Sequence, residues 1–167
     1  MKELVLIRHA KSSWDDLRMP DHDRTLNARG ERDAPAMATW LSGKIEAPDM
    51  VIVSTATRAR DTADKFIKAF GVSEDSVVRT RDVYEATVES LCDLIAWVPP
   101  NEAERVMVVG HNPTMTMMLD HLTTARVDNM PTCSIAVIRF PHAASWKELG
   151  AGELVLFATP KDVRGDK

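Results

Sequence analysis

This sequence of 167 residues has little cysteine, no long apolar run and no excess of positive charge, and each of these absences excludes a class of protein. The two cysteines, Cys92 and Cys133, form no Cys-x-x-Cys pair, so neither a disulfide scaffold nor a cysteine-based zinc or redox motif is expected. Reduced thiols are typical of a cytosolic protein. No apolar run approaches the ~20 residues of a membrane span, and residues 4–7 are too few for the apolar part of a signal peptide. We therefore expect a cytoplasmic protein without a membrane partner.

The charge balance excludes a further class of partner. The 21 basic and 25 acidic residues leave a formal net charge of -4, whereas broad nucleic-acid binding normally shows as a basic excess or stripe. A small cationic pocket remains compatible with this balance. With 44% hydrophobic and 28% charged residues, the chain has the composition of one globular domain. We expect that domain to cover residues 1–160, followed by a charged, frayed tail over residues 161–167.

The sequence alternates between buried strands and amphipathic helices. Continuous apolar runs predict strands, and apolar residues at helical spacing between end signals such as Asn27 and Gly71 predict helices. The expected strands are residues 3–9, 50–53, 77–79, 105–110, 134–140 and 153–158, the last two as an antiparallel pair at one edge. The expected helices lie between Asn27 and Gly43 and over residues 57–70, 88–98 and 113–122. This alternation predicts an α/β domain with a largely parallel central sheet.

Histidines and arginines follow three of the predicted strands. Arg8 and His9 end the first strand, Arg58 lies just beyond the second, and His111 follows the fourth. Ligands of α/β sheets bind beyond the carboxyl ends of the strands, so these side chains should meet at one edge. Arginine forks and helix N-termini favour a dianionic phosphate. Two imidazoles beside them suggest a nucleophile and a stabilising or proton-transferring partner.

A metal site is the alternative interpretation of the two histidines. No carboxylate or cysteine stands at a ligand spacing such as His-Glu-x-x-His, and the neighbouring arginines would repel a divalent cation. We therefore predict no metal and no other cofactor.

Arg60 follows Arg58 by two positions in the same predicted helix, so it should point to a different face as a surface charge.

These residues lie in motifs that resemble those of the histidine phosphatase superfamily, which includes cofactor-dependent phosphoglycerate mutases and acid phosphatases. Residues 8–10 (RHA) resemble the Arg-His-Gly motif, residues 54–62 (STATRARDT) the S-x-x-x-R-A-x-x-T segment, and residues 110–112 (GHN) the second histidine motif. The stretches RHAKSSW, DHDRTLNARG and VYEA are similar to the short SixA-like branch, the phosphohistidine phosphatases. Two positions depart from these patterns: Ala10 stands where much of the superfamily has glycine, and Thr25 where the SixA-like pattern often has proline.

The resemblance implies a three-layer, phosphoglycerate mutase-like fold and a metal-independent phosphatase. It implies that neutral His9 attacks phosphorus and becomes phosphorylated. Arg8, Arg58 and His111 would bind the phosphoryl oxygens, and water would then hydrolyse the intermediate.

The resemblance leaves the proton donor open. Glu85 falls where the family's L-x-E carboxylate would stand, but it is equally well explained as a solvated charge at a helix entry. Asp15 is the reserve candidate. Ser12 or Ser13 would add a hydroxyl contact to the phosphate.

The substrate is the remaining question. The long lid-forming insertion of the mutases is absent, so we expect an open, shallow site that admits a protein side chain or a modest metabolite. The expected partner is thus a phosphorylated protein, a phosphohistidine protein in particular, or a small phosphorylated substrate. Two alternatives stay open: a small-molecule phosphomonoesterase, and a non-catalytic module that binds phosphate or a phosphoprotein. The presence of His9 argues against the second, because binding alone requires no nucleophile. The sequence does not indicate the oligomeric state.

Overall fold

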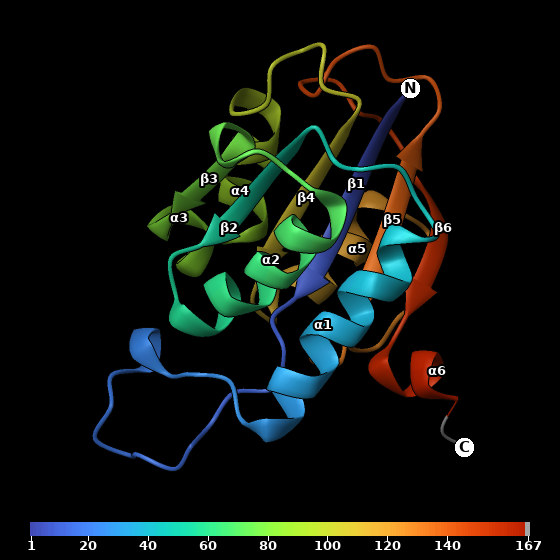
Figure 1. Cartoon of the computed structure of the whole chain (residues 1–167). Coiled ribbons are helices and arrows are strands. Elements are labelled where there is room, and N and C mark those ends of the chain that lie inside the picture. The colour runs from blue at the N-terminus through green and yellow to red at the C-terminus, as the bar shows by residue number, and fades with distance from the viewer. Residues whose placement is uncertain (166–167) are drawn as a thin grey trace.

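One six-stranded sheet organises the fold (Figure 1), and the computed structural model describes residues 1–165. The strands are β1 (Lys2–Arg8), β2 (Met50–Ser54), β3 (Val77–Thr80), β4 (Arg105–Gly110), β5 (Ile135–Phe140) and β6 (Glu153–Ala158). They lie in the order β3-β2-β4-β1-β5-β6. The first four strands of the chain are parallel, whereas β5 runs antiparallel to β1 and β6 antiparallel to β5. The predicted antiparallel edge pair is confirmed.

Helices cover both faces of this sheet. They are α1 (Ala28–Ser42), α2 (Thr57–Phe70), α3 (Arg81–Tyr84), α4 (Val88–Trp97), α5 (Thr114–Leu122) and α6 (Pro160–Arg164), with 3-10 turns at Asp21–Asp23 and Glu74–Ser76. In Figure 1, α1 and α2 lie in front of the sheet and α4 and α5 lie behind it. The predicted three-layer α/β arrangement with a mostly parallel sheet is therefore confirmed.

The alternation of side chains along β1 explains the two hydrophobic cores. Successive strand residues point to opposite faces of a sheet. Val5 and Ile7 belong to the core on the side of α1 and α2, whereas Leu4 and Leu6 belong to the core on the side of α4 and α5. All four side chains are fully buried. Because both faces of the strand are covered, its sequence is a continuous apolar run rather than an alternating one.

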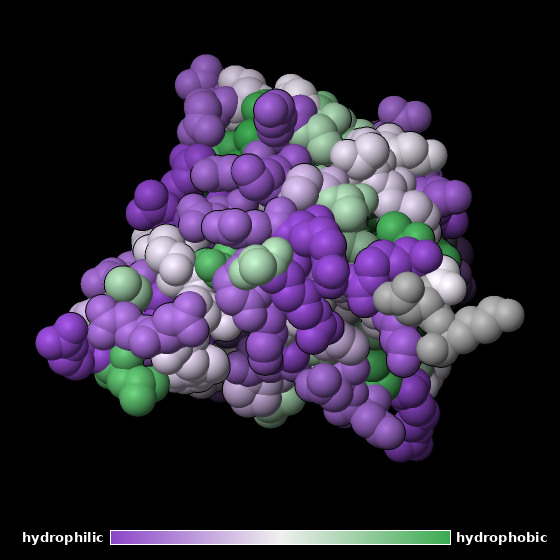
Figure 2. Space-filling model, turned by 60° about the horizontal axis from the view of Figure 1, so that its bottom comes forward, coloured by the Kyte–Doolittle hydropathy of each residue, from purple (hydrophilic) through white to green (hydrophobic). Residues whose placement is uncertain are grey.

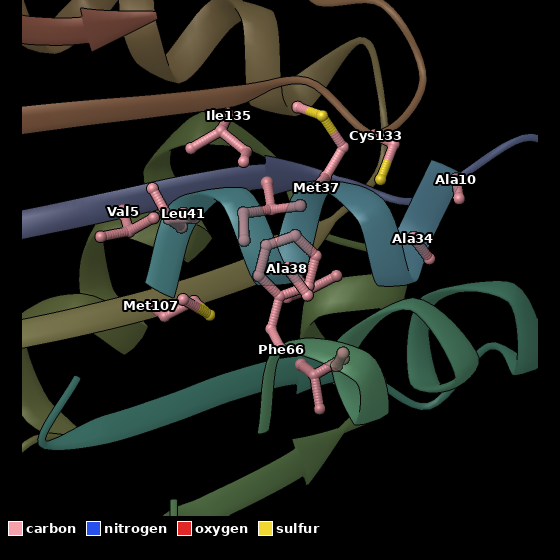
Figure 3. Close-up of a cluster of buried hydrophobic side chains, with 14 of the residues drawn as sticks. Val5, Ala10, Ala34, Met37, Ala38, Leu41, Phe66, Met107, Cys133 and Ile135 are labelled. Atoms are coloured by element: carbon pink, nitrogen blue, oxygen red, sulfur yellow. The ribbon is translucent and has the colours of Figure 1, made fainter. Parts of the chain in front are cut away.

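The core beneath α1 and α2 holds the first turn of α2 in place. Figure 3 shows Met37 and Leu41 of α1 and Phe66 of α2 packed over Val5 and Met107 of the sheet. Phe66 is fully buried, so its replacement by alanine should cost about 3–5 kcal/mol of stability. The same packing fixes the position of the residues at the start of α2, which face the candidate site.

The residues that were predicted to begin and end helices do so in the structure. Asn27 is the N-cap of α1 and accepts a hydrogen bond from Gly30 N–H (2.9 Å), and Gly71 ends α2 with a φ of 68°. Gly30 also lies very close to the backbone of the segment after β1, since a Cβ on it would lie 2.1 Å from the backbone oxygen of Lys11. The absence of a side chain at Gly30 therefore lets α1 pack directly on the segment that follows β1.

The end of the chain differs from the sequence-based expectation. A frayed tail from residue 161 is wrong for residues 161–165, because α6 begins at Pro160 and continues to Arg164. Thr159 forms a capping box with Asp162. Arg164 Nη1 donates to Oδ1 of the buried Asp33 in α1 (2.8 Å), which ties α6 to α1. The capping box and the ion pair stabilise this helix, which is too short for its sequence to show a hydrophobic period. Residues 166–167 of the expected tail lie outside the described residues.

Candidate active site

Two histidines meet at the carboxyl end of the central strands. β1 and β4 pair with Arg8 opposite Gly110, so His9 and His111 are the next residues along adjacent strands. The backbone N–H of His9 donates to Gly110 O (3.0 Å), and the centroids of the two imidazole rings lie 5.1 Å apart. Figure 2 turns this end of the molecule towards the viewer, and its surface is mainly hydrophilic. The structure thus brings together the two histidines that strand order predicts to meet.

A backbone hydrogen bond orients His9. Its Nδ1 lies 2.7 Å from Ala10 O, and a carbonyl oxygen only accepts, so Nδ1 carries the proton and Nε2 carries the lone pair. The Ala10 N–H donates to Thr62 Oγ1 (2.9 Å), which fixes the turn that follows the strand. His9 is buried, with an exposed fraction of 7%. Desolvation by burial lowers the pKa of His9 to about 3, and the nearby charges of Arg58 and Arg8 act in the same direction. His9 is therefore neutral near pH 7.

Ser54, at the end of β2, orients His111. Ser54 Oγ accepts a hydrogen bond from Ala56 N–H (3.1 Å) and lies 2.7 Å from His111 Nε2. Ser54 therefore holds His111 through Nε2, and donation from the Ser54 hydroxyl would leave the proton of the neutral ring on Nδ1. Desolvation lowers the pKa of His111 to about 4, and the charge of Arg58 also lowers it. His111 Nδ1 is buried and has no hydrogen-bond partner among the described residues.

Two guanidinium groups complete the predicted set. Arg8 Nη1 donates to Met130 O (2.9 Å), and its Nε is buried without a partner among residues 1–165. Arg58, in the first turn of α2, is buried, with an exposed fraction of 5%, and its Nε also lacks a partner in this part of the chain. Arg60 is exposed, as the helical spacing predicts. Two unpaired guanidinium N–H groups and the imidazole N–H of His111 suit the oxygens of an oxyanion.

A network around Asp21 joins this cluster from the segment between β1 and α1, drawn in blue in Figure 1. Arg58 Nη1 donates to Asp21 O (2.6 Å) and Arg58 Nη2 to Asp21 Oδ2 (2.9 Å). Tyr84 O–H donates to the same Oδ2 (2.7 Å), and Arg24 Nε donates to Oδ1 (3.0 Å). Sequence reasoning did not identify these contacts, although Asp21, Arg24 and Tyr84 lie in the DHDRTLNARG and VYEA stretches that carry the family resemblance.

The electrostatics of this network keep Asp21 ionised. Desolvation raises the pKa of Asp21, but the hydrogen bonds from Tyr84 and Arg58 outweigh it and hold that pKa below its ordinary value. Hydrogen bonding to Asp21 raises the pKa of Tyr84. The carboxyl group that contacts the cationic cluster is thus a hydrogen-bond acceptor at neutral pH, not a proton donor.

A third histidine lies at the edge of the cluster. His22 Nε2 lies 2.8 Å from Thr55 Oγ1, and its ring meets Tyr84 edge-on with centroids 4.9 Å apart. Tyr84 in turn meets His111 edge-on at 5.4 Å. The ring of Tyr84 therefore contacts two imidazoles. Helix α3 places the ring there, and because Tyr84 does not directly follow a strand, the strand-end pattern in the sequence did not indicate it.

The serines and Asp15 of the sequence-based set lie on the segment after β1. Ser12 is buried, and its Oγ accepts a hydrogen bond from Arg24 Nη1 (2.7 Å). Ser13 Oγ accepts from the backbone N–H of Asp15 (3.1 Å), and Asp15 itself is exposed. The described contacts thus connect Ser12 to the network through Arg24 and leave Asp15 on the surface.

Glu85 does not contact the histidine cluster among the described residues. Its carboxylate forms an ion pair with Arg81 (Nε to Oε1, 3.2 Å), and the side chain is 63% exposed. It lines a surface hollow of about 510 Å³ together with Asp82, Leu94 and Trp97. Tyr84 is the last residue of α3 and its ring contacts His111, whereas Glu85 is the C-cap of that helix and its carboxylate pairs with Arg81.

Residues 1–165 contain no group of three or more histidine, cysteine, aspartate or glutamate side chains placed to bind a metal ion. No helix within those residues has the length and apolar character required to cross a bilayer.

Fold and cluster together define a class: an α/β protein with two histidines and two arginines gathered at the carboxyl edge of its sheet. The chain belongs to the histidine phosphatase superfamily, branch 1, whose sequence profile matches residues 4–91. An uncharacterized chloroplastic protein of Arabidopsis thaliana is 32% identical over 154 residues, covering 88% of this chain and 70% of the relative. An uncharacterized protein of Mycobacterium tuberculosis is 34% identical and covers 93% of this chain and all of its own length.

Solved structures agree with this assignment. The candidate phosphohistidine phosphatase SixA of Agrobacterium tumefaciens has a TM-score of 0.81 and 31% identity, with 95% of this chain and 98% of that chain covered. The protein histidine phosphatase SixA in complex with tungstate has a TM-score of 0.80 at 20% identity, covering 96% and 99% of the two chains, and shows a shared fold. The fold is therefore the expected phosphoglycerate mutase-like one.

Proposed function

We propose that this protein is a phosphatase that forms a covalent phosphohistidine on His9 and hydrolyses it with water. The observation that carries the proposal is the orientation of His9. Its Nδ1–H is engaged by Ala10 O, so the lone pair of a neutral ring is left on Nε2 beside Arg8, Arg58 and His111. Membership of the histidine phosphatase superfamily supports the same chemistry.

The reaction has two displacement steps. First, the lone pair of His9 Nε2 forms a bond to phosphorus while the bond to the leaving oxygen or nitrogen breaks with its electron pair. Water then attacks phosphorus, the bond to Nε2 breaks, and inorganic phosphate leaves with His9 restored. The low pKa of His9 suits the first step, because a protonated ring has no lone pair to attack with. The hydrogen bond from Nδ1 to Ala10 O persists when the ring becomes positively charged.

Arg8, Arg58 and His111 stabilise the transferring group. Each has a buried N–H without a partner among residues 1–165, and these donors are held in place by Met130 O, Asp21 and Ser54. Donors oriented before the reaction stabilise the charge that develops on the equatorial oxygens, at about 3–4 kcal/mol for a well-placed donor. These groups provide the charge stabilisation without a metal ion.

The protonation states favour a phosphohistidine substrate. The carboxyl group in contact with the cluster, Asp21, is ionised, and Glu85 is engaged with Arg81 on the surface. An alkyl phosphate needs an acid to protonate its basic leaving oxygen. The imidazole of a phosphohistidine leaves neutral once solvent has protonated its other nitrogen. The similarity to SixA structures, whose names refer to phosphohistidine or protein histidine phosphatases, supports this substrate class.

A substrate panel tests the proposal. A phosphohistidine peptide, p-nitrophenyl phosphate, a phosphoserine peptide and a sugar phosphate are compared with and without a chelator. We expect phosphate release in the chelator, with kcat/KM highest for the phosphohistidine peptide. Loss of activity in the chelator would contradict metal independence. A preference for the sugar phosphate would identify a small-molecule phosphomonoesterase, and binding without turnover would identify a non-catalytic module.

A further inference from the structure

Asp21 is the common partner of three side chains around the candidate phosphate site. Its carboxylate accepts hydrogen bonds from Arg58 and Tyr84 on Oδ2 and from Arg24 on Oδ1. Its backbone oxygen accepts a further bond from Arg58 Nη1. The side chain is 49% exposed and takes no part in the hydrophobic core. These contacts therefore concern the arrangement of the site more than the stability of the fold.

The contacts with Asp21 select one edge of the Arg58 guanidinium. A guanidinium has five N–H donors in a planar fork. Asp21 accepts one hydrogen bond from each terminal nitrogen of Arg58, and these two bonds occupy the end of the fork. The remaining edge consists of Nε–H, which is buried without a partner among the described residues, and the second hydrogen of the adjacent terminal nitrogen. That edge matches two oxygens of a phosphoryl group in bidentate geometry.

The charge of Asp21 has a second effect. Arg58 and Arg24 are both buried and both bind the same carboxylate through its two oxygens. Two guanidiniums this close repel each other, and an anion between them holds them together. Arg24 in turn donates to Ser12 on the segment after His9, so the bridge extends to the catalytic segment.

We infer that Asp21 is a positioning residue, which holds the end of the Arg58 fork so that the Nε edge is presented to the phosphoryl group. The inference rests on the proposed role of Arg58 as a phosphate ligand. Asp21 itself does not touch the reacting atoms, since an anion in contact with the phosphoryl oxygens would oppose their binding. Its contribution is to orient a donor before the reaction, when reorientation would otherwise add to the barrier.

The test compares Asp21→Asn with Asp23→Asn. Asn at position 21 keeps the shape of the side chain but loses its charge and one acceptor. Asp23 lies on the same turn and is exposed, and the contact of its carboxylate within residues 1–165 is with the ring of His22 (3.4 Å), so it is a matched control. We expect Asp21→Asn to lower kcat/KM by about 10- to 100-fold, mainly through kcat, and to weaken tungstate binding by about tenfold or more in calorimetry. Asp23→Asn should change both by less than about twofold.

A double-variant cycle with Arg58→Gln separates positioning from a general structural effect. If Asp21 acts through Arg58, the double variant should be no worse than Arg58→Gln alone, to within about twofold. Full additivity, or an Asp21→Asn variant that behaves like Asp23→Asn, would overturn the inference. If the wild-type protein binds tungstate but hydrolyses none of the substrates, the proposed function fails, and the calorimetric cycle still decides the role of Asp21. A wild-type protein that binds no tungstate would overturn both.

Discussion

The imidazoles of His9 and His111 lie 5.1 Å apart because the strands that carry them, β1 and β4, are neighbours and pair Arg8 with Gly110. The two rings are held by different acceptors and donors, His9 by Ala10 O and His111 by Ser54 Oγ. His9 thereby keeps its lone pair on Nε2, whereas His111 is held through Nε2 and its Nδ1 has no partner among the described residues. Substitution of either ring should thus remove a different part of the same reaction.

His9→Ala should abolish turnover because it removes the proposed nucleophile. Brief incubation of the wild-type protein with labelled substrate should give an acid-labile, base-stable phosphoenzyme, which the variant should not form. His142→Ala, which removes an exposed histidine, is the control and should form the phosphoenzyme normally. Normal activity in His9→Ala would disprove the mechanism.

Arg58→Ala and Arg60→Ala should differ sharply. Arg58 is buried at the site, whereas Arg60 is exposed on another face of α2. Loss of a charge-assisted donor to the transition state should lower kcat/KM about 100-fold or more for Arg58→Ala. Arg60→Ala should leave kcat/KM within about twofold of the wild type. Equal effects in steady-state kinetics would show that Arg58 does not bind the phosphoryl group.

Glu85→Gln should have a small and uniform effect on all substrates, because Glu85 pairs with Arg81 on the surface. A proton donor behaves differently: its loss slows alkyl phosphates far more than p-nitrophenyl phosphate, whose leaving group needs no proton. The measurement is the ratio of kcat/KM for a phosphoserine peptide and p-nitrophenyl phosphate in wild type and variant. A ratio that falls about tenfold or more would assign the acid role to Glu85 after all.

Stability should decrease at acidic pH through His9. Burial lowers its pKa to about 3, whereas a histidine of the unfolded chain has a pKa near 6.5, so between these values the unfolded state binds more protons. The free energy of unfolding should therefore fall as the pH decreases from about 7 to about 4. His9→Gln has no ring to protonate and should show a shallower fall in urea titrations. A fall in His9→Gln as steep as in the wild type would contradict this explanation.

The strand-end residues of the site could be predicted from sequence because parallel strands carry them to one edge. Arg8, His9 and His111 directly follow apolar runs, and Arg58 follows one by a short, turn-containing connection. Their meeting depends on strand order alone, which buried runs and intervening helices indicate.

The remaining residues of the cluster could not be predicted in the same way. Asp21 and Arg24 lie in a polar segment without hydrophobic period, and only the path of that segment brings them to Arg58. Tyr84 belongs to a helix of four residues, too short to show which face is buried. The sequence therefore indicated the stretch that contributes to the cluster but not Tyr84 as the residue that contacts Asp21, and the role of Glu85 as a proton donor stays a prediction.

The position of β1 has a consequence for motion. Its backbone is bonded on one side to β4 and on the other to β5, over six residue pairs each. Amide hydrogens of such an inner strand exchange with solvent only when the whole domain opens. His9, the proposed nucleophile, directly follows this inner strand, whereas Asp21 and Arg24 lie on the segment before α1. In native-state hydrogen exchange we expect this segment to open at much lower free energy than β1, so the arginine side of the site can loosen while the histidines stay in place.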